Sequence, residues 1–267
     1  MSASLLLAAL VGVGVGVVVG ALGAGGGILT VPVLVYLLGQ SPHEATTGSL
    51  LIVMVTALVA LPSRQRRQQV CWRTGLVFAA VASLGAWGGS WLNGQVGEQM
   101  LMAGLAALLS VVSAVMVRSG LRQRARDRAV VGSQPGAQHT EPRAPAGRAR
   151  LVGAGLLTGA LTGFFGVGGG FAVVPVLTLV LAIDIRRAAG TSLLVMVVTT
   201  AVSLLERATA GIVIDLPVVA AFAVGSAAGG LIGGPVSQRA RSSTLTLLFA
   251  LILAGTAVRS LVALLLA

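Results

Sequence analysis

The 267-residue sequence has little charge and few side chains that react or bind metals. Only 9% of its residues are charged, whereas a soluble domain carries about 25%. Its one cysteine, Cys71, excludes a disulfide framework and a thiolate metal cluster. The two histidines, His43 and His139, lie outside the long apolar segments. The composition therefore excludes an ordinary cytosolic protein, and no metal or cofactor is expected.

Apolar residues and glycine are abundant. Apolar residues make up 56% of the chain, which has 37 glycines and a mean hydropathy of +0.97. Eight uncharged apolar segments follow one another, at 5–38, 45–61, 75–94, 99–117, 151–182, 188–205, 216–234 and 243–264. A helix needs about 20 apolar residues to cross a bilayer, so six segments fit one crossing each. The first and fifth are longer, and a glycine cluster interrupts each one, which predicts a break in both helices.

All 18 basic residues are arginine, and the formal net charge is +11. In a soluble protein this charge would indicate nucleic acid, but beside transmembrane helices it indicates topology. Eight of the arginines lie within residues 118–150, together with three prolines. We therefore expect a first transmembrane repeat at 1–117, an Arg-rich cytoplasmic linker at 118–150 and a second transmembrane repeat at 151–267. The lipid bilayer is the expected surrounding, and no nucleic acid is expected as a partner.

The two halves align without a gap when the chain is shifted so that Gly12 falls on Gly155. The positions that this one shift matches are Gly12, Gly16 and Gly20 with Gly155, Gly159 and Gly163; Gly23, Gly25, Gly26 and Gly27 with Gly166, Gly168, Gly169 and Gly170; and Pro32 with Pro175. Hydrophobicity alone does not explain glycine and proline at fixed offsets. The match indicates an internal duplication.

The arginines also indicate how the repeats are oriented. If segment 151–182 enters and leaves the membrane on one side, 16 of the 18 arginines are cytoplasmic, with Arg207 outside and Arg259 near a span end. A single crossing of that segment leaves only 13 inside, so the positive-inside rule favours the hairpin. The prediction is an all-α polytopic membrane protein with two inverted repeats, each a broken or re-entrant helical hairpin plus three transmembrane helices. Inverted repeats with discontinuous helices are typical of secondary transporters.

The glycine clusters have the chemistry of an anion site. Broken helices leave backbone N–H groups at membrane depth, glycine lets an anion approach them, and the following helix directs its positive end toward the anion. The predicted substrate-binding glycines are Gly23, Gly25, Gly26, Gly27, Gly166, Gly168, Gly169 and Gly170. Pro32 and Pro175 are expected in the first turns of the following helices, as structural helix breaks. The ladders at Gly12/16/20 and Gly155/159/163 are better explained by close helix packing.

Hydroxyl side chains begin the next helix of each half. The segments Thr47-Gly48-Ser49 and Thr191-Ser192 fall in matching places, and the hydroxyls of Thr47, Ser49, Thr191 and Ser192 either donate to an oxyanion or cap a helix. No ionisable residue is predicted deep within a span, which leaves proton coupling without support. For the same reason the chain is not expected to be an enzyme.

Two copies of the pattern G-x-G-G-G-x-x-x-x-P-x-L, at 23–34 and 166–177, resemble the sulfite exporter TauE/SafE family of bacterial membrane permeases. The resemblance covers both halves. It implies transport of small sulfur-containing anions, such as sulfite or organosulfonates, across the bacterial inner membrane. Position 48 is glycine where the second half has Thr191, which is a departure between the repeats.

Two hypotheses follow. The first is a secondary transporter of small inorganic or organic anions, with both glycine breaks at a midplane site. The alternative is a non-transporting membrane scaffold or assembly partner, which docks a soluble enzyme through its cytoplasmic linker. Deletion of residues 122–147 separates the two, because only the scaffold needs that segment.

Overall fold

A computed structural model describes residues 2–22, 27–66, 68–130, 148–179, 183, 185–209, 214–239, 255 and 258. Over these residues the chain forms helices and no strand. The helices are α1 (Ser2–Leu22), α2 (Gly27–Tyr36), α3 (Pro42–Arg66), α4 (Trp72–Gln95), α5 (Glu98–Val130), α6 (Arg148–Phe165), α7 (Gly170–Leu179), α8 (Ile185–Thr209) and α9 (Leu216–Arg239). The predicted all-α class is confirmed.

Within the described part of the chain, four helices are long and apolar enough to cross a membrane. They span Pro42–Arg66, Trp72–Gln95, Arg187–Thr209 and Leu216–Gly233. Each coincides with an apolar segment predicted to cross once, so the chain is a multi-pass membrane protein. The predicted span at 243–264 lies outside the described residues, apart from positions 255 and 258.

Both long apolar segments are divided into two helices, as predicted. In the first, α1 ends at Leu22 and α2 begins at Gly27; in the second, α6 ends at Phe165 and α7 begins at Gly170. The described break, between α6 and α7, contains glycines with positive φ, a conformation that other residues rarely adopt. The second glycine cluster therefore ends α6, whereas positions 23–26 of the first cluster lie outside the described residues.

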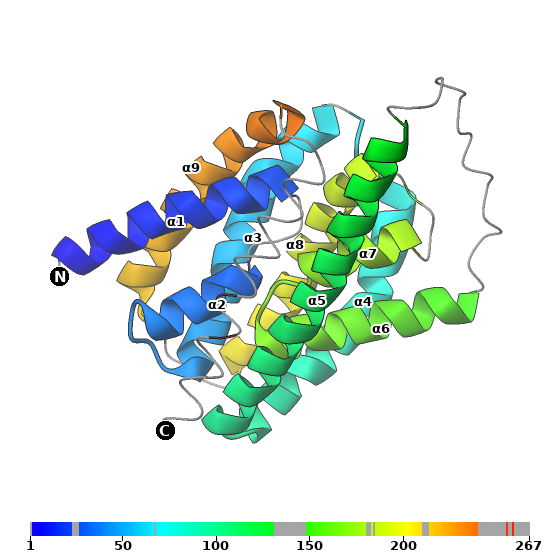
Figure 1. The fold of residues 1–267 in the computed structure, drawn as a ribbon. Coiled ribbons are helices and arrows are strands. Elements are labelled where there is room, and N and C mark those ends of the chain that lie inside the picture. The colour runs from blue at the N-terminus through cyan, green and yellow to red at the C-terminus, as the bar shows by residue number, and fades with distance from the viewer. Residues whose placement is uncertain are drawn as a thin grey trace.

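The duplication is visible in the helices themselves. The shift that aligns the two sequences carries the bounds of α2 onto those of α7 and the bounds of α3 onto those of α8, and it carries α4 onto α9 to within one position. Packing repeats in the same way: α1 contacts α9 as α6 contacts α4, while α3 and α8 contact each other between these pairs (Figure 1). The first helix of each half thus packs on the fourth helix of the other half. The inverted membrane orientation stays a prediction.

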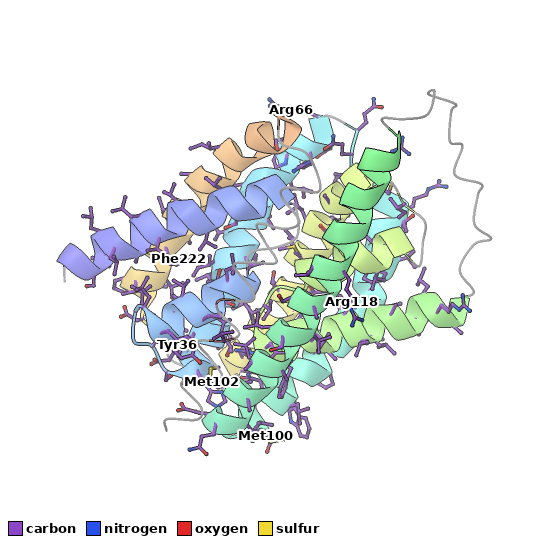
Figure 2. The ribbon with its side chains drawn as sticks, viewed as in Figure 1. Tyr36, Arg66, Met100, Met102, Arg118 and Phe222 are labelled. Atoms are coloured by element: carbon purple, nitrogen blue, oxygen red, sulfur yellow. The ribbon has the colours of Figure 1, made fainter. Side chains whose placement is uncertain are left out.

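Glycine ladders hold these exchanged pairs together. A methyl group added at Gly16 would overlap the Ser226 carbonyl on α9, and one at Gly159 would overlap the Ala82 carbonyl on α4. Phe222, fully buried on α9, lies where α1 crosses (Figure 2). The ladders therefore serve close backbone packing, as expected.

The helix bounds differ in detail from two expectations. Helix α5 continues from Glu98 to Val130 and so crosses the predicted boundary at 117/118. Arginine, alanine and glutamine are good helix formers, and the first proline of the segment comes only at Pro135, so a high charge did not end the helix. The division into two repeats and a linker stays a prediction.

The second difference is the position of the prolines within their helices. Pro32 lies inside α2, beyond its first turn, and residue 175 has the equivalent place in α7. Proline at this depth removes one hydrogen bond near the start of a helix, and the helix continues on both sides of it. In the described break, between α6 and α7, the residues with positive φ are glycines, and the role of Pro32 and Pro175 as helix breaks stays a prediction.

Candidate functional site

The loop between α6 and α7 has a backbone that only glycine fits. Gly166, Gly168 and Gly169 are buried, with φ of +65°, +68° and +64°. A methyl group at Gly166 would overlap the Thr46 carbonyl, and one at Gly169 would overlap the Thr162 hydroxyl. Both the backbone conformation and the close approach of neighbouring helices therefore require glycine here.

This loop is bonded to the first turn of α7. The Gly170 N–H donates to the Gly168 carbonyl at 2.8 Å, and the N–H of Val173 donates to Gly169 at 2.9 Å. Gly27, the first residue of α2, packs so closely on Val167 that an added methyl group would overlap the Val167 carbonyl. The start of α2 thus packs against the loop that precedes α7. The predicted residues Gly23, Gly25 and Gly26 are outside the described residues.

The predicted hydroxyl residues are all buried and bonded within the chain. Ser49 donates to the Gly166 carbonyl, Thr47 to the His43 carbonyl at 2.9 Å and Ser192 to the Ala189 carbonyl at 2.8 Å. A hydroxyl has one hydrogen, so these three have none left for an oxyanion in this arrangement.

Thr191 uses its hydroxyl oxygen as an acceptor. The Cys71 N–H, directly before α4, donates to Thr191 Oγ1 at 3.0 Å. Position 48, the equivalent of Thr191, is glycine and has no such group. The contacts of these hydroxyls are bonds to carbonyls of their own helix, for Thr47 and Ser192, and bonds to distant segments, for Ser49 and Thr191. Substrate binding by these side chains stays a prediction.

Arg207 requires a correction. The arginine count placed it in an external loop, but it lies in the last turn of α8 with only 1% of its surface exposed. Arg207 lies near the end of its helix, as expected for an ionisable residue, but its side chain is buried rather than solvated. A charged residue near the end of an apolar segment is usually solvated, and the sequence alone predicts this for Arg207. Its side chain instead points inward and forms hydrogen bonds with three other helices.

The guanidinium of Arg207 has four bonds, all to neutral acceptors. Nε donates to Ser90 Oγ at 3.1 Å, and Nη2 donates to the Gly163 carbonyl at 2.7 Å. Nη1 donates to Oγ1 of Thr46 at 2.8 Å and of Thr47 at 2.7 Å. None of the acceptors that the structure shows for Arg207 is a carboxylate. A full positive charge is therefore buried without an ion pair among the described residues.

A second side chain binds the end of α6 next to Arg207. Asn93 on α4 is fully buried, and its Nδ2 donates to the Phe164 carbonyl at 2.7 Å. His43, in the first turn of α3, lies 3.2 Å from Asn93 Oδ1 through Nδ1. The last turn of α6 thus receives donors from both Arg207 and Asn93, which occupy carbonyls that lack helical partners.

The same arrangement recurs in the first half. The shift that revealed the repeat carries Arg64 onto Arg207 and Gly20 onto Gly163. Arg64 donates from Nη2 to the Gly20 carbonyl at 2.9 Å, as Arg207 donates to Gly163. The sequence alignment therefore already paired these arginines. Sequence reasoning missed the site because it used both only as topology markers.

The described residues contain no cluster of three or more His, Cys, Asp or Glu that could hold a metal ion. The chemistry of the break is that of glycine backbone, helix ends and one guanidinium. These groups bind anions by charge and N–H donation and supply no acid, base or nucleophile.

Comparison with known proteins places the chain among membrane transporters. A sequence model of the sulfite exporter TauE/SafE family matches residues 8–260. A "Probable membrane transporter protein" of Xylella fastidiosa (strain 9a5c) is 32% identical over 249 residues, covering 91% of this chain and 90% of the relative. "Probable membrane transporter protein YunE" of Bacillus subtilis (strain 168) is 24% identical over 264 residues, covering 94% of each. No solved structure shows significant similarity.

Proposed function

The chain belongs to the sulfite exporter TauE/SafE family of membrane transporters, and from this premise we propose that it is a secondary transporter of small anions. The proposed substrates are sulfite, organosulfonates and related sulfur oxyanions. The proposed location is the inner membrane of a bacterium.

The buried helix break carries the proposal. Three left-handed glycines, Gly166, Gly168 and Gly169, lie in the interior beside Gly27 of the other half. The start of α7 directs the positive end of its dipole at a ligand in the break, while the N–H groups of Gly170 and Ala172 donate within the loop. A buried cation, Arg207, lies at the other side of the loop. A small oxyanion is the ligand that this combination fits best.

Transport follows from the duplication. In transporters built from repeats, the substrate site lies where discontinuous helices meet, and one unit rocks against the other around it. Here the contact of Gly27 with Val167 brings the start of α2 against the loop between α6 and α7. Motion of α1 and α2 relative to α6 and α7 would open this point to each side of the membrane in turn.

Flux through the purified protein tests the proposal. Liposomes that contain the full chain should release sulfite, thiosulfate or sulfoacetate faster than protein-free liposomes, and faster than they release glycerol. Equal release of all solutes, with and without protein, would contradict a transport function.

Glycine variants test the location of the site. Gly169→Ala should abolish flux, because its φ is +64° and the methyl group would meet Thr162. Gly153→Ala is the matched control, since a methyl group there meets no atom within 4 Å. Protein amounts are equalised per liposome, and retained flux in Gly169→Ala would move the site elsewhere.

A reporter tests the inverted orientation. The predicted topology places both ends of the chain outside the cytoplasm, so alkaline phosphatase fused after position 267 should be active and a cytoplasmic reporter fused there should not. The opposite pattern would leave the helix break in place and overturn the inversion.

A further inference from the structure

We propose that Arg207 is the residue that makes the helix break selective for anions. The inference deepens the proposed function and rests on it. It starts from the two helix ends at the break, which carry opposite partial charges of about half an elementary charge each. The C-terminal end of α6 is negative, and the N-terminal end of α7 is positive. At a point between them the two contributions largely cancel, so the backbone alone does not select the sign of a ligand.

Arg207 changes this balance. Its Nη2 donates to the Gly163 carbonyl at 2.7 Å, in the last turn of α6, and so places a full positive charge on the negative helix end. The loop is close, because Thr46, which accepts from Nη1, also packs its carbonyl against Gly166. The summed charge of the two helix ends and the guanidinium is positive. An anion at the break is therefore attracted, and a cation is repelled.

A purely structural role does not require this charge. One residue further along, the Phe164 carbonyl accepts from the neutral amide of Asn93 at 2.7 Å, and Asn93 is also fully buried. A neutral donor thus satisfies one free carbonyl of α6, while a guanidinium satisfies its neighbour. Burying a cation is unfavourable, and the nearby carboxylate of Glu206 attracts the guanidinium but accepts none of its four hydrogen bonds. The charge itself, beyond its hydrogen bonds, is what an anion site needs.

The surroundings keep the charge available. Ser90, Thr46 and Thr47 orient the guanidinium without neutralising it. One hydrogen of Nη2 has no acceptor among the described residues, since the four bonds use four of the five N–H groups. With 1% of its surface exposed, Arg207 is not screened by bulk water.

A matched pair of variants tests the charge without removing Arg207. Ser90→Asp places a carboxylate against Nε and neutralises the guanidinium, whereas Ser90→Asn has nearly the same size and adds no charge. In liposomes with equal protein, sulfite flux should be at least tenfold lower in Ser90→Asp than in Ser90→Asn. Equal flux in the two variants would overturn the proposal.

Substitution of the arginine is the second arm. Arg207→Lys keeps the positive charge, whereas Arg207→Gln keeps only an N–H donor. Because the charge is what attracts the anion, sulfite flux should be about tenfold lower in Arg207→Gln than in Arg207→Lys. Arg187→Gln, at an exposed position of the same helix, removes the same charge and should match the unchanged chain. Greater flux in Arg207→Gln than in Arg207→Lys would show that hydrogen bonding, and not charge, is the role of Arg207.

Thermal unfolding in detergent separates this inference from the proposed substrate. The unchanged chain is heated with sulfite, sulfate, thiosulfate or chloride at constant ionic strength, and the anion that raises Tm most is used for the variants. If sulfite gives no flux but another anion raises Tm, sulfite is not the substrate. The proposed role of Arg207 is still supported in that case if the anion raises Tm of Ser90→Asn but not of Ser90→Asp. If no anion raises Tm or crosses the membrane, both proposals fail.

Discussion

The two halves of the molecule use the same arginine in different surroundings. Arg207 and Arg64 each donate from Nη2 to a glycine carbonyl near the end of the first helix of their half. Arg207 is buried among hydroxyl groups, whereas Arg64 is half-buried and donates from Nη1 to Gln69 Oε1 at 3.1 Å. The carbonyl contact was kept after duplication, and the groups around it changed.

The sequence shows how the surroundings diverged. The hydroxyl partners of Arg207 are Thr46, Thr47 and Ser90, and the equivalent positions are Ala189, Gly190 and Gly233. None of these three has a hydroxyl. The Gln69 backbone occupies the space at Gly190, where a methyl group would overlap the Gln69 carbonyl. A duplicated contact can therefore be fixed rigidly in one half and loosely in the other.

The largest expected difference comes from removing each arginine. Arg207→Ala should lower the free energy of unfolding by about 3 kcal/mol, because it leaves a cavity and the Gly163 carbonyl without its donor. Arg64→Ala should cost less than about 1 kcal/mol, since water reaches this half-buried side chain. Unfolding in detergent measures both. Equal losses would mean that the two surroundings do not differ in energy.

A smaller effect is expected from one hydroxyl. Thr46→Val keeps the shape of the side chain and removes its bond to Arg207 Nη1, which should cost about 2 kcal/mol for a buried bond to a charged group. Ala189→Val, at the equivalent position, is the comparison, because it changes packing without removing a hydrogen bond. If Thr46→Val unfolds at the same denaturant concentration as the unchanged chain, the hydroxyl shell does not hold Arg207.

In each half, a glycine packs against a larger side chain of the other half, and a double-mutant cycle can test one of these contacts. A methyl group at Gly48 would lie 2.8 Å from Val219 Cγ2, and one at Gly75 would lie 2.9 Å from Thr191 Cγ2. Gly48→Ala should therefore destabilise the protein, and Val219→Ala should restore about 1 kcal/mol of the loss. Additive effects of the two substitutions would contradict this contact.

The smallest effect is expected at Gln69. Gln69→Ala removes the Nη1 bond of Arg64 in a half-buried place, and should cost about 0.5 kcal/mol. Arg66→Ala, on the exposed end of α3 (Figure 2), serves as the control with no measurable change. A loss in Gln69→Ala as large as that in Thr46→Val would remove the distinction between the two halves.

Much of the fold follows from local rules that the sequence displays. Glycines at four-residue spacing predicted the packing of Gly16 and Gly159, and consecutive glycines predicted the breaks before Gly27 and Gly170. These features depend on the lack of a side chain, which a sequence states directly. The end of α5 was less predictable, because arginine is both a hydrophilic residue and a good helix former. Composition shows only that the segment is hydrophilic.

The environment of Arg207 required knowledge of contacts between distant segments. Its acceptors lie on α3, α4 and α6, and no local pattern says that these helices converge on one turn of α8. The pairing of Arg64 with Arg207 was present in the shifted alignment, together with Gly20 and Gly163. What the alignment lacked was the inward direction of the side chain, because it results from tertiary packing.

The exchange of first helices between the halves affects the order in which the protein can be assembled. Helix α6 leaves the ribosome when its partner α4 has already been made, so its glycine face can be covered at once. Helix α1 is made first, yet its partner α9 begins only at Leu216. Contacts of such long sequence separation form late. The glycines of α1 therefore can pack against α9 only after most of the chain has been synthesised. The first half is not expected to fold stably on its own.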